Sequence, residues 1–289
     1  MNKIDSLIES LLNKIEEADA IVIGGAAGMS TAAGYNMYIS DERFFRYFGS
    51  FAEKYGISNA FDGYYYNFKT REERWAYIAA LFKNLIDFPM TKPYMNLKKL
   101  IENKNYFVVT TNQDTQFSLT FPEEKVSAIQ GDWRYLQCND RCHDKIYPSY
   151  EILKRLYENT KGTSVPTEMI PVCPECGADM EPWVRSYVFL QGTAYKEAYR
   201  KYHGFLQENM YKKILFLELG VGMMTPMFIK EPFWNMTYNL PKASYITINP
   251  KDAIVPDEIK DKSLAIQEDI AEVLERAVKA LEDRENAYC

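Results

Sequence analysis

The first group of residues with the types and spacing to do chemistry is a polar run that follows a short apolar segment. The apolar residues 106–109 lead into Thr110-Thr111-Asn112-Gln113-Asp114, and Gln130-Gly131 begins sixteen residues after Asp114. Ligands of open α/β sheets bind at the carboxyl ends of strands, so a polar cluster there indicates a functional site, although Asn and Asp also serve plain turns. Gln130 offers an amide and has no group that takes up a proton near neutral pH.

The second group is formed by two pairs of cysteines. Cys138 pairs by spacing with Cys142, and Cys173 pairs with Cys176, while Cys289 is the last residue of the chain. Each pair can place two thiolates on one tight turn, and four thiolates are the ligand set of structural zinc. The alternative is four unrelated buried thiols. His143 directly follows the first pair, but four cysteines complete a site, which favours a surface position for this histidine.

A glycine-rich segment follows the first apolar run, residues 20–23. It reads Gly24-Gly25-Ala26-Ala27-Gly28-Met29-Ser30 and reaches a further glycine at Gly34. The segment does not match the G-x-G-x-x-G dinucleotide pattern, and it has no lysine for a P-loop. Small residues here would let the backbone approach a pyrophosphate at a helix N-terminus, but they also serve close packing of a helix on a sheet.

Short apolar runs alternate with amphipathic segments along the chain and would position these groups. We expect an amphipathic helix over residues 3–17 and a closing helix over residues 270–281. Short buried strands are expected at residues 20–23, 106–109, 214–219, 245–248 and 264–266. This alternation predicts an α/β fold with a doubly wound, Rossmann-like parallel sheet.

Two segments interrupt the alternation. Residues 41–88 carry aromatic residues at helical spacing, and residues 133–183 contain the four paired cysteines. We expect both to form a smaller domain, made of a helical insertion and a four-Cys zinc module. The Rossmann-like domain would then comprise residues 1–40, 89–132 and 184–289. Aromatic residues such as those at 64–66 indicate a core or, alternatively, the wall of a cleft between the two domains.

Composition narrows the class of protein. The 289 residues carry a net charge of −6, with 47% apolar and 26% charged residues, as is ordinary for a soluble globular protein. Nucleic-acid binding relies on clustered Lys and Arg, and this charge gives no general attraction to it. The first residues lack an apolar signal core, and the uncharged stretch 20–40 is too polar for a membrane span. We therefore expect a cytoplasmic protein without a membrane segment.

These motifs together resemble those of sirtuins. Sirtuins carry a Thr-Gln-Asn-Ile-Asp run after a buried strand, a His-Gly dipeptide at a similar distance, and a four-Cys zinc module between that dipeptide and later strands of the sheet. Their Gly-Ala-Gly-x-Ser loop has counterparts in Ala26, Ala27, Gly28 and Ser30, and Gly34 matches a following glycine. The match stops at Tyr35-Asn36-Met37-Tyr38, where sirtuins have Ile-Pro-Asp-Phe-Arg. The family's Asp and Arg have no clear counterpart, although Asp41 and Arg43 lie nearby.

The resemblance implies roles for individual residues around NAD. Asn112 would hold the nicotinamide ribose and order water near its anomeric carbon, Asp114 would bind the carboxamide, and Gln130 would face the ribose hydroxyls. These three residues form the expected catalytic set. Cofactor contacts are implied, besides the three catalytic residues, for Ala26, Ala27, Gly28, Ser30, Gly34, Tyr38, Thr111, Gly220, Val221, Gly222, Asn249, Asp269 and Ile270.

The glutamine at position 130 stands where sirtuins have the histidine that acts as general base. General base catalysis contributes about two to four orders of magnitude, so deacylation should stall without it. ADP-ribosyl transfer depends more on positioning and electrostatics. The combination is similar to the macrodomain-linked, class M sirtuins. This resemblance implies NAD-dependent ADP-ribosylation of a lipoylated carrier related to the glycine cleavage H protein. It also implies that a macrodomain partner removes the ADP-ribose again. The alternatives are a weak deacylase, an NAD hydrolase, or a non-catalytic NAD-binding regulatory module.

Overall fold

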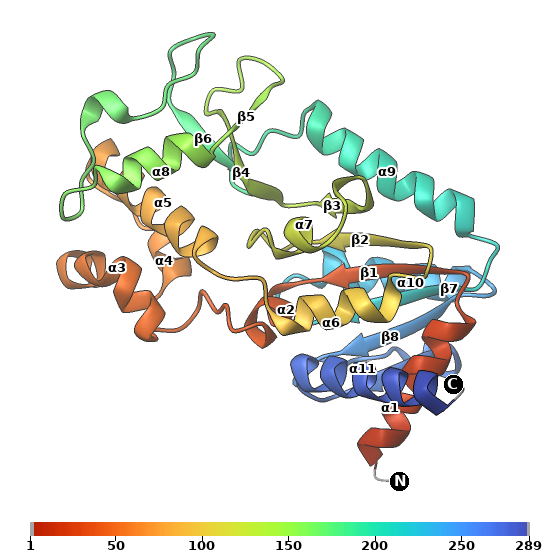
Figure 1. The fold of residues 1–289 in the computed structure, drawn as a ribbon. Coiled ribbons are helices and arrows are strands. Elements are labelled where there is room, and N and C mark those ends of the chain that lie inside the picture. Colours follow the sequence, from red (N-terminus) through yellow and green to blue (C-terminus); the bar gives the residue numbers. More distant parts are fainter. Residues whose placement is uncertain (1–2, 288–289) are drawn as a thin grey trace.

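A six-stranded parallel sheet forms the larger part of the protein (Figure 1). The computed structural model describes residues 3–287, so Cys289 lies outside the described residues. The strand order is β3-β2-β1-β7-β8-β9, and every neighbouring pair is parallel. The strands are β1 (Ala20–Gly25), β2 (Tyr106–Thr110), β3 (Val126–Ala128), β7 (Ile214–Leu219), β8 (Ser244–Ile248) and β9 (Ser263–Ile266). The predicted doubly wound α/β fold is confirmed.

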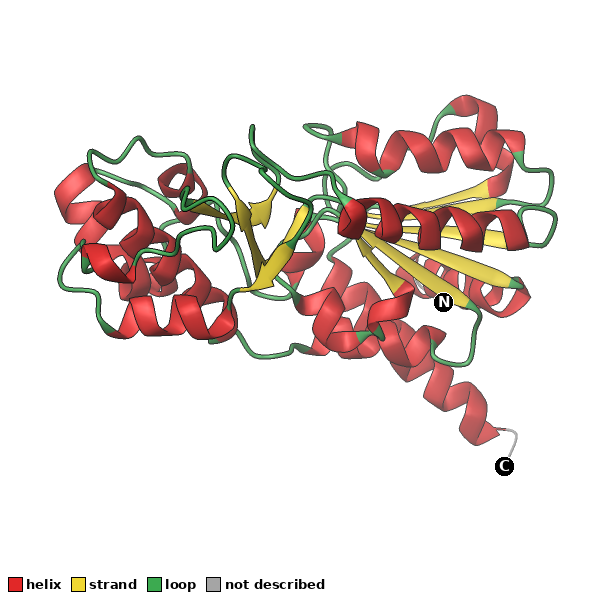
Figure 2. Ribbon diagram, turned by 90° about the horizontal axis from the view of Figure 1, so that it is seen from above, coloured by secondary structure: helices red, strands yellow, loops and turns green. Residues whose placement is uncertain are grey.

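Helices cover both faces of this sheet because successive residues of each strand point to opposite faces. Ile21 and Ile23 of β1 belong to one apolar cluster, and Ala20 and Val22 belong to another. The first face is covered by α1 (Lys3–Glu17), α6 (Lys92–Ile101) and α11 (Ile270–Ala287). The second face is covered by α9 (Thr193–Asn209) and α10 (Lys230–Asn239). Figure 2 shows the strands between these helices.

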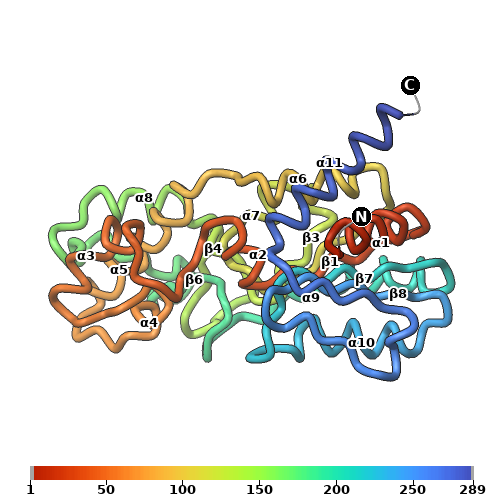
Figure 3. The backbone as a smooth tube through the Cα atoms, turned by 90° about the horizontal axis from the view of Figure 1, so that it is seen from below, coloured from red at the N-terminus to blue at the C-terminus, as the bar shows by residue number. Residues whose placement is uncertain are grey.

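The terminal helices agree with the sequence-based expectations. The first matches the predicted range 3–17, and the last starts at the predicted residue and continues to Ala287. Arg284 of α11 donates hydrogen bonds to Glu9 and to Asn13 of α1, the latter at 2.8 Å. Helices α1 and α11 therefore pack together on the larger lobe (Figure 3).

A smaller lobe contains an antiparallel sheet, which the sequence did not predict. Its strand order is β5-β4-β6, with β4 (Gly131–Cys138), β5 (Ile146–Pro148) and β6 (Met180–Val184). Its helices are α3 (Glu42–Tyr55), α4 (Ala60–Tyr64), α5 (Arg71–Ile86) and α8 (Tyr150–Glu158). One apolar cluster includes residues from both the aromatic segment and the cysteine segment, so the two insertions share a core.

Most of the aromatic segment is core, as expected. Helix α5 is buried on nearly all sides, from Trp75 to Leu85. Within the run at 64–66, only Tyr64 packs against the core. The Tyr64 ring lies 5.4 Å from that of Trp133, whereas Tyr65 and Tyr66 are exposed.

Short helices complete the described chain. They are α2 (Ala27–Ala32), α7 (Gln116–Thr120), η1 (Glu123–Lys125), η2 (Thr167–Met169), η3 (Pro226–Phe228) and η4 (Asp257–Lys262). Among the helices within residues 3–287, none has the length and apolar character to cross a membrane.

Candidate active site

The carboxyl ends of β1 and β2 bring the glycine-rich loop and the polar run together. The two strands are neighbours, and Gly25 is paired with Thr110. The Thr110 hydroxyl and the Thr111 N–H both donate to the Gly25 carbonyl, at 2.9 and 3.1 Å. The Asn112 amide donates to the Ala26 carbonyl at 3.0 Å. In the strand order, β1 lies between β2 and β7, which is the topological switch point where ligands of such sheets bind.

Asp114 is buried at this edge and accepts three hydrogen bonds. The Ser30 hydroxyl donates to its Oδ2 at 2.5 Å, the Tyr94 hydroxyl donates to the same oxygen at 3.3 Å, and the Gln116 N–H donates to Oδ1 at 3.1 Å. Burial raises the pKa of Asp114, and these three donors lower it without cancelling the increase. The carboxylate is thus held in one orientation by neutral donors.

Tyr94 is a residue of this site that the sequence did not reveal. It lies near the start of α6 and is fully buried. Burial, and then the negative charge of Asp114, raise the pKa of its hydroxyl well above 10.0, so the hydroxyl stays protonated and can donate. The chain has 22 tyrosines, and no pattern in the sequence marks this one.

Asn112 and Gln130 present polar atoms that have no partner within the described chain. The Asn112 side-chain nitrogen donates to Ala26 and, at 3.5 Å, to the Tyr94 hydroxyl, which leaves its Oδ1 free. The Gln130 carbonyl accepts from the Arg185 N–H at 2.8 Å and from the Gln113 side chain at 3.4 Å. The side-chain amide of Gln130, a half-buried residue, makes no hydrogen bond within residues 3–287. Gln113, also missed from sequence, therefore ties the polar run to Gln130.

The glycine-rich loop contacts the turn after β7. The Gly28 N–H donates to the Gly220 carbonyl at 3.0 Å, and a Cβ atom on Gly28 would lie 2.6 Å from Gly220 Cα. Gly220 has a φ of +69°, which favours glycine. The Met29 N–H donates to Ala26, so among the first three amides of α2 only that of Ala27 is unpaired within the described residues. Both glycines are required for the contact between the turns.

Three more of the predicted cofactor residues, Val221, Gly222 and Asn249, lie in the turns after β7 and β8. Val221 is buried, and its carbonyl accepts from the Asn249 side chain at 3.1 Å. The Asn249 Oδ1 accepts from the N–H groups of Lys251 and Asp252, at 2.9 and 3.0 Å. Asn249 therefore holds the turn after β7 and the turn after β8 together, with Gly222 between Val221 and the Asp252 carboxylate.

Asp269 and Ile270 lie at the far end of the same edge. Asp269 precedes α11 and accepts from the Glu272 N–H at 3.0 Å, while the Ile270 side chain is buried in the core. Helix α11 follows β9, which is four strands from β2 in the sheet. At about 4.8 Å per strand the separation is roughly 19 Å, which only an extended ligand spans.

Tyr38 lies apart from the Asp114 cluster. Its ring is 52% exposed and 4.9 Å from the Phe61 ring of the smaller lobe. Gly34, with a φ of +91°, ends the preceding turn. Asp41 caps α3 through the Phe44 N–H, and Arg43 donates to Asn84 at 2.6 Å. Asp41 and Arg43 are thus both engaged within the smaller lobe.

A buried ion pair lies one residue before the turn after β7. Glu218 of β7 and Lys230 of α10 are both fully buried, with 2.8 Å between Nζ and Oε1. Glu218 also accepts from the hydroxyls of Tyr245 and Thr247, and Lys230 donates to the Asp252 carbonyl at 2.9 Å. The pair connects β7, β8, α10 and the turn that contains Asn249.

The four predicted metal ligands lie together. Their sulfur atoms are all within 4.8 Å of one another, and the pairs Cys138–Cys176 and Cys142–Cys173 are each 3.6 Å apart. Zinc–sulfur bonds of 2.3 Å in a tetrahedron require about 3.8 Å between sulfurs, so the residues fit a zinc ion. His143 is half-buried rather than on the surface, because its Nε2 lies 3.4 Å from Cys173 Sγ and 2.9 Å from the Tyr147 hydroxyl.

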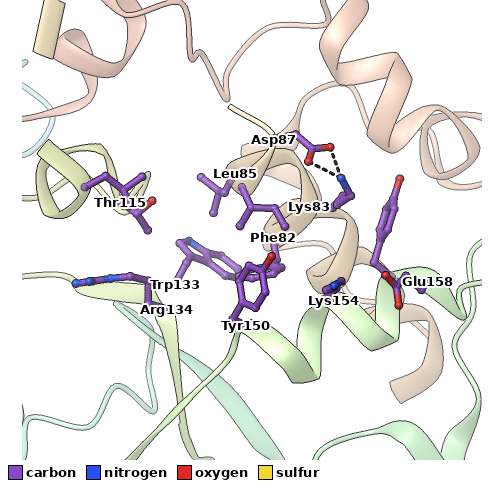
Figure 4. Close-up of a pocket in the computed structure, with 13 residues that line it drawn as sticks. Phe82, Lys83, Leu85, Asp87, Thr115, Trp133, Arg134, Tyr150, Lys154 and Glu158 are labelled. Atoms are coloured by element: carbon purple, nitrogen blue, oxygen red, sulfur yellow. Dashed lines mark hydrogen bonds and ion pairs between the residues drawn. The ribbon is translucent and has the colours of Figure 1, made fainter. Parts of the chain in front are cut away.

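A pocket of about 550 Å³ opens beside the polar run (Figure 4). Phe82, Leu85 and Trp133 supply apolar lining, with Thr115 at one side. Lys83 and Asp87 form an ion pair at its rim. None of the predicted catalytic, cofactor or metal residues lines the pocket. It can accept an apolar group next to the segment that carries Asp114.

Two curated proteins are similar to this chain over most of its length. A protein ADP-ribosyltransferase of Staphylococcus aureus strain Mu50 is 34% identical over 275 residues, which cover 94% of this chain and 87% of that protein. A probable bifunctional ADP-ribose hydrolase/ADP-ribosyltransferase of Fusarium oxysporum f. sp. cubense is 28% identical, and the match covers 90% of this chain but 46% of that longer protein. No protein-family model matches the chain.

Solved structures with the same fold are sirtuins. A Sir2 homologue in complex with NAD aligns with a TM-score of 0.62 over 96% of this chain and 94% of that one, at 16% identity. A Sir2 homologue in complex with ADP-ribose aligns with a TM-score of 0.59 over 96% and 98% of the two chains, also at 16% identity. The fold is that of the sirtuins, and by its similarity to the Staphylococcus aureus protein the chain belongs to the sirtuin-type protein ADP-ribosyltransferase family.

Proposed function

We propose that this protein transfers ADP-ribose from NAD to a protein acceptor and releases nicotinamide. The observation that carries the proposal is the pairing of a preserved Asn112–Asp114 site with an amide, Gln130, in place of a titratable base. The similarity to a protein ADP-ribosyltransferase supports the same reaction. NAD supplies the ADP-ribosyl group and its nicotinamide leaving group.

The residues at the sheet edge suit the binding of NAD. Among the described residues, Gln116 N–H is the single donor to Asp114 Oδ1, so this oxygen can accept another hydrogen bond from a carboxamide. Asn112 Oδ1 can accept from a ribose hydroxyl, and the Gln130 amide can hydrogen-bond another. The Gln116 side chain is buried with neither amide atom paired among the described residues. An unpaired buried amide costs about 1–3 kcal/mol, which supports an ordered water or a polar ligand atom beside this side chain.

The absence of an imidazole from this site favours transfer over deacylation. The chain has two histidines, and both are described. His143 contacts Cys173, and the ring of His203 on α9 stacks 6.0 Å from that of Tyr199. Neither can supply the base that would activate a ribose hydroxyl in a deacylase, whereas bond cleavage assisted by positioning requires none.

For the acceptor, we propose a lipoylated carrier protein related to the glycine cleavage H protein. The pocket beside Thr115 supports this choice because its apolar part, formed by Phe82, Leu85 and Trp133, suits the apolar body of a lipoyl arm. A functional link to a macrodomain hydrolase is also proposed, supported by the Fusarium relative, whose name combines hydrolase and transferase.

We further propose that the protein is cytoplasmic. We also propose two domains: a Rossmann-like domain of residues 1–40, 89–132 and 184–289, and a smaller domain of residues 41–88 and 133–183.

Zinc is proposed as a structural component. Four thiolates leave no open position for water or substrate, so the ion would hold the two cysteine turns and take no part in transfer. Metal analysis of freshly purified protein should give one equivalent per chain. A value far below one would contradict the assignment.

Incubation with NAD labelled in the adenylate, with and without a lipoylated carrier, tests the proposed reaction. Label on the carrier supports transfer, and an unlipoylated carrier is the matched control for the acceptor. Free ADP-ribose without labelled protein would show a hydrolase, and loss of acyl groups from an acyl-lysine peptide would show a deacylase. NAD that binds but is not consumed with any acceptor would show a regulatory module.

A further inference from the structure

Tyr94 is the one site residue with a hydroxyl placed between Asp114 and Asn112. Its ring packs edge-on against Phe117, with 4.9 Å between ring centroids, and neither ring is more than 1% exposed. Packing therefore fixes the position of the hydroxyl. The residue follows Pro93 in the first turn of α6, the helix by which the chain returns from the smaller lobe to the large sheet.

The hydroxyl uses its donor and an acceptor position within the site. It donates to Asp114 Oδ2 at 3.3 Å and accepts from the Asn112 side-chain nitrogen at 3.5 Å. The same Asn112 nitrogen donates to the Ala26 carbonyl, so Asn112 is oriented with its oxygen free. One hydroxyl thus links the group expected to bind the carboxamide with the group expected to bind the ribose.

Asp114 depends on such neutral donors because no cation contacts it within the described residues. The titratable groups that face it are Tyr35, Tyr94 and Asp132. Asp132 carries negative charge and opposes ionisation of Asp114. The ionised form is favoured only by Ser30, Tyr94 and the Gln116 N–H, so the loss of one donor is not compensated.

We propose that Tyr94 is a positioning residue for ADP-ribosyl transfer: its hydroxyl donates to Asp114, accepts from Asn112, and so fixes the two side chains relative to each other. The inference rests on the proposed function, since it assigns NAD to this site. If the hydroxyl is removed, Asp114 takes up a proton at a higher pH than in the wild type. A protonated carboxyl then loses acceptor capacity toward a carboxamide.

The test compares Tyr94→Phe with Tyr106→Phe. Tyr106 is also a buried tyrosine of the same apolar cluster, and its hydroxyl makes no hydrogen bond within residues 3–287, so the control removes the same atom away from the site. Each change removes one oxygen and leaves the ring, which preserves packing. NAD binding and initial rates of nicotinamide release should be measured from pH 5 to 8, with melting temperature as the fold control.

We expect Tyr94→Phe to lower kcat about two- to tenfold, as one hydrogen bond predicts. The acid limb of its rate profile should move to higher pH, whereas Tyr106→Phe should match the wild type in both respects. Tyr94→Phe with an unchanged acid limb and unchanged kcat would overturn the inference, even if the melting temperature fell. Wild-type protein that binds no NAD would instead overturn the proposed function.

A double-mutant cycle separates positioning from general loosening. If Tyr94 acts through Asp114, the change Tyr94→Phe should weaken NAD binding in the wild type but add little in an Asp114→Asn background. Equal losses in both backgrounds would show that Tyr94 does not act through Asp114 and would refute the proposed role.

Discussion

Asp114 and Glu218 are two buried carboxylates near the same edge of the sheet, and they are stabilised in different ways. Burial raises the pKa of both. Glu218 accepts three hydrogen bonds within the described residues, from the Lys230 ammonium and the Thr247 hydroxyl on Oε1 and from the Tyr245 hydroxyl on Oε2. Asp114 also accepts three, two on Oδ2 and one on Oδ1, but all of its donors are neutral.

The difference shows what each carboxylate can do. The Lys230 cation balances the charge of Glu218, so this pair holds β7, β8 and α10 in place without a ligand. No cation contacts Asp114 within the described residues, so its carboxyl group is positioned by neutral donors and can still act on a polar ligand. Desolvation of a carboxylate must be compensated, and the choice of partner decides whether the group stabilises the fold or binds substrate.

The largest effect is expected from breaking the ion pair. Lys230→Met would leave Glu218 buried without its cation, which should reduce the free energy of unfolding by about 3–5 kcal/mol. The double change Glu218→Leu with Lys230→Met should restore most of that loss, since a buried pair can often be replaced by apolar residues. Urea unfolding measures both.

Lys99→Met is the control for this prediction, since Lys99 pairs with Glu282 on the surface. Surface pairs contribute little, so we expect no measurable change. If Lys230→Met were as stable as this control, the view of Glu218 as a structural carboxylate would be wrong.

Asp114→Asn is expected to act on catalysis rather than on stability. An amide cannot replace a carboxylate as a charged acceptor, and loss of one preorganised electrostatic contact costs about 10²–10³ in rate. The rate of nicotinamide release should fall by this factor while urea unfolding at pH 7 shows no loss. A variant that unfolds at lower urea but releases nicotinamide at the wild-type rate would place Asp114 with Glu218 as a structural group.

The pH dependence of stability gives a finer distinction. The pKa of Asp114 is raised above its ordinary value of 3.8, so the folded state binds the proton more tightly than the unfolded state does. The stability that tighter proton binding by Asp114 contributes is therefore fully present below about pH 3.8. It is lost as the pH rises through the pKa that Asp114 has in the folded state. Relative to the wild type, Asp114→Asn should gain stability between pH 4 and pH 7.

Unfolding of both proteins across this pH range measures the difference. A constant gap between wild type and Asp114→Asn would mean that burial does not perturb Asp114. Ser30→Ala is a useful companion because it removes a donor to the same carboxylate and should steepen the pH dependence.

The smallest effect is expected at Gln130. Its side chain has no partner within the described residues, so Gln130→Ala should leave stability unchanged. Loss of one hydrogen bond to a ribose hydroxyl would slow transfer about two- to tenfold. Labelled NAD with the acceptor measures this rate. Transfer at the wild-type rate would remove Gln130 from the catalytic set.

Local patterns in the sequence predicted much of the fold. Five of the six parallel strands are apolar runs that periodicity marks, but β3 has three residues and is too short to mark itself. The antiparallel strands β4, β5 and β6 lie among the cysteines, where no long alternating run occurs. The clustering of the four cysteines was predictable because zinc chemistry limits the type and spacing of its ligands.

What the sequence by itself determined is the identity of the reactive groups: the polar run after β2, the glutamine at position 130, and the four thiols. Only the tertiary structure decided their partners. Tyr94 and Lys230 have no distinctive sequence pattern, and their partners lie 20 and 12 residues away in the sequence. Gln113 is part of the polar run, but its contact with Gln130, 17 residues away, was not marked by that pattern. Hydrogen bonds and ion pairs form over about 3 Å, and that distance is set by how the strands and helices pack, which no local pattern of residues encodes.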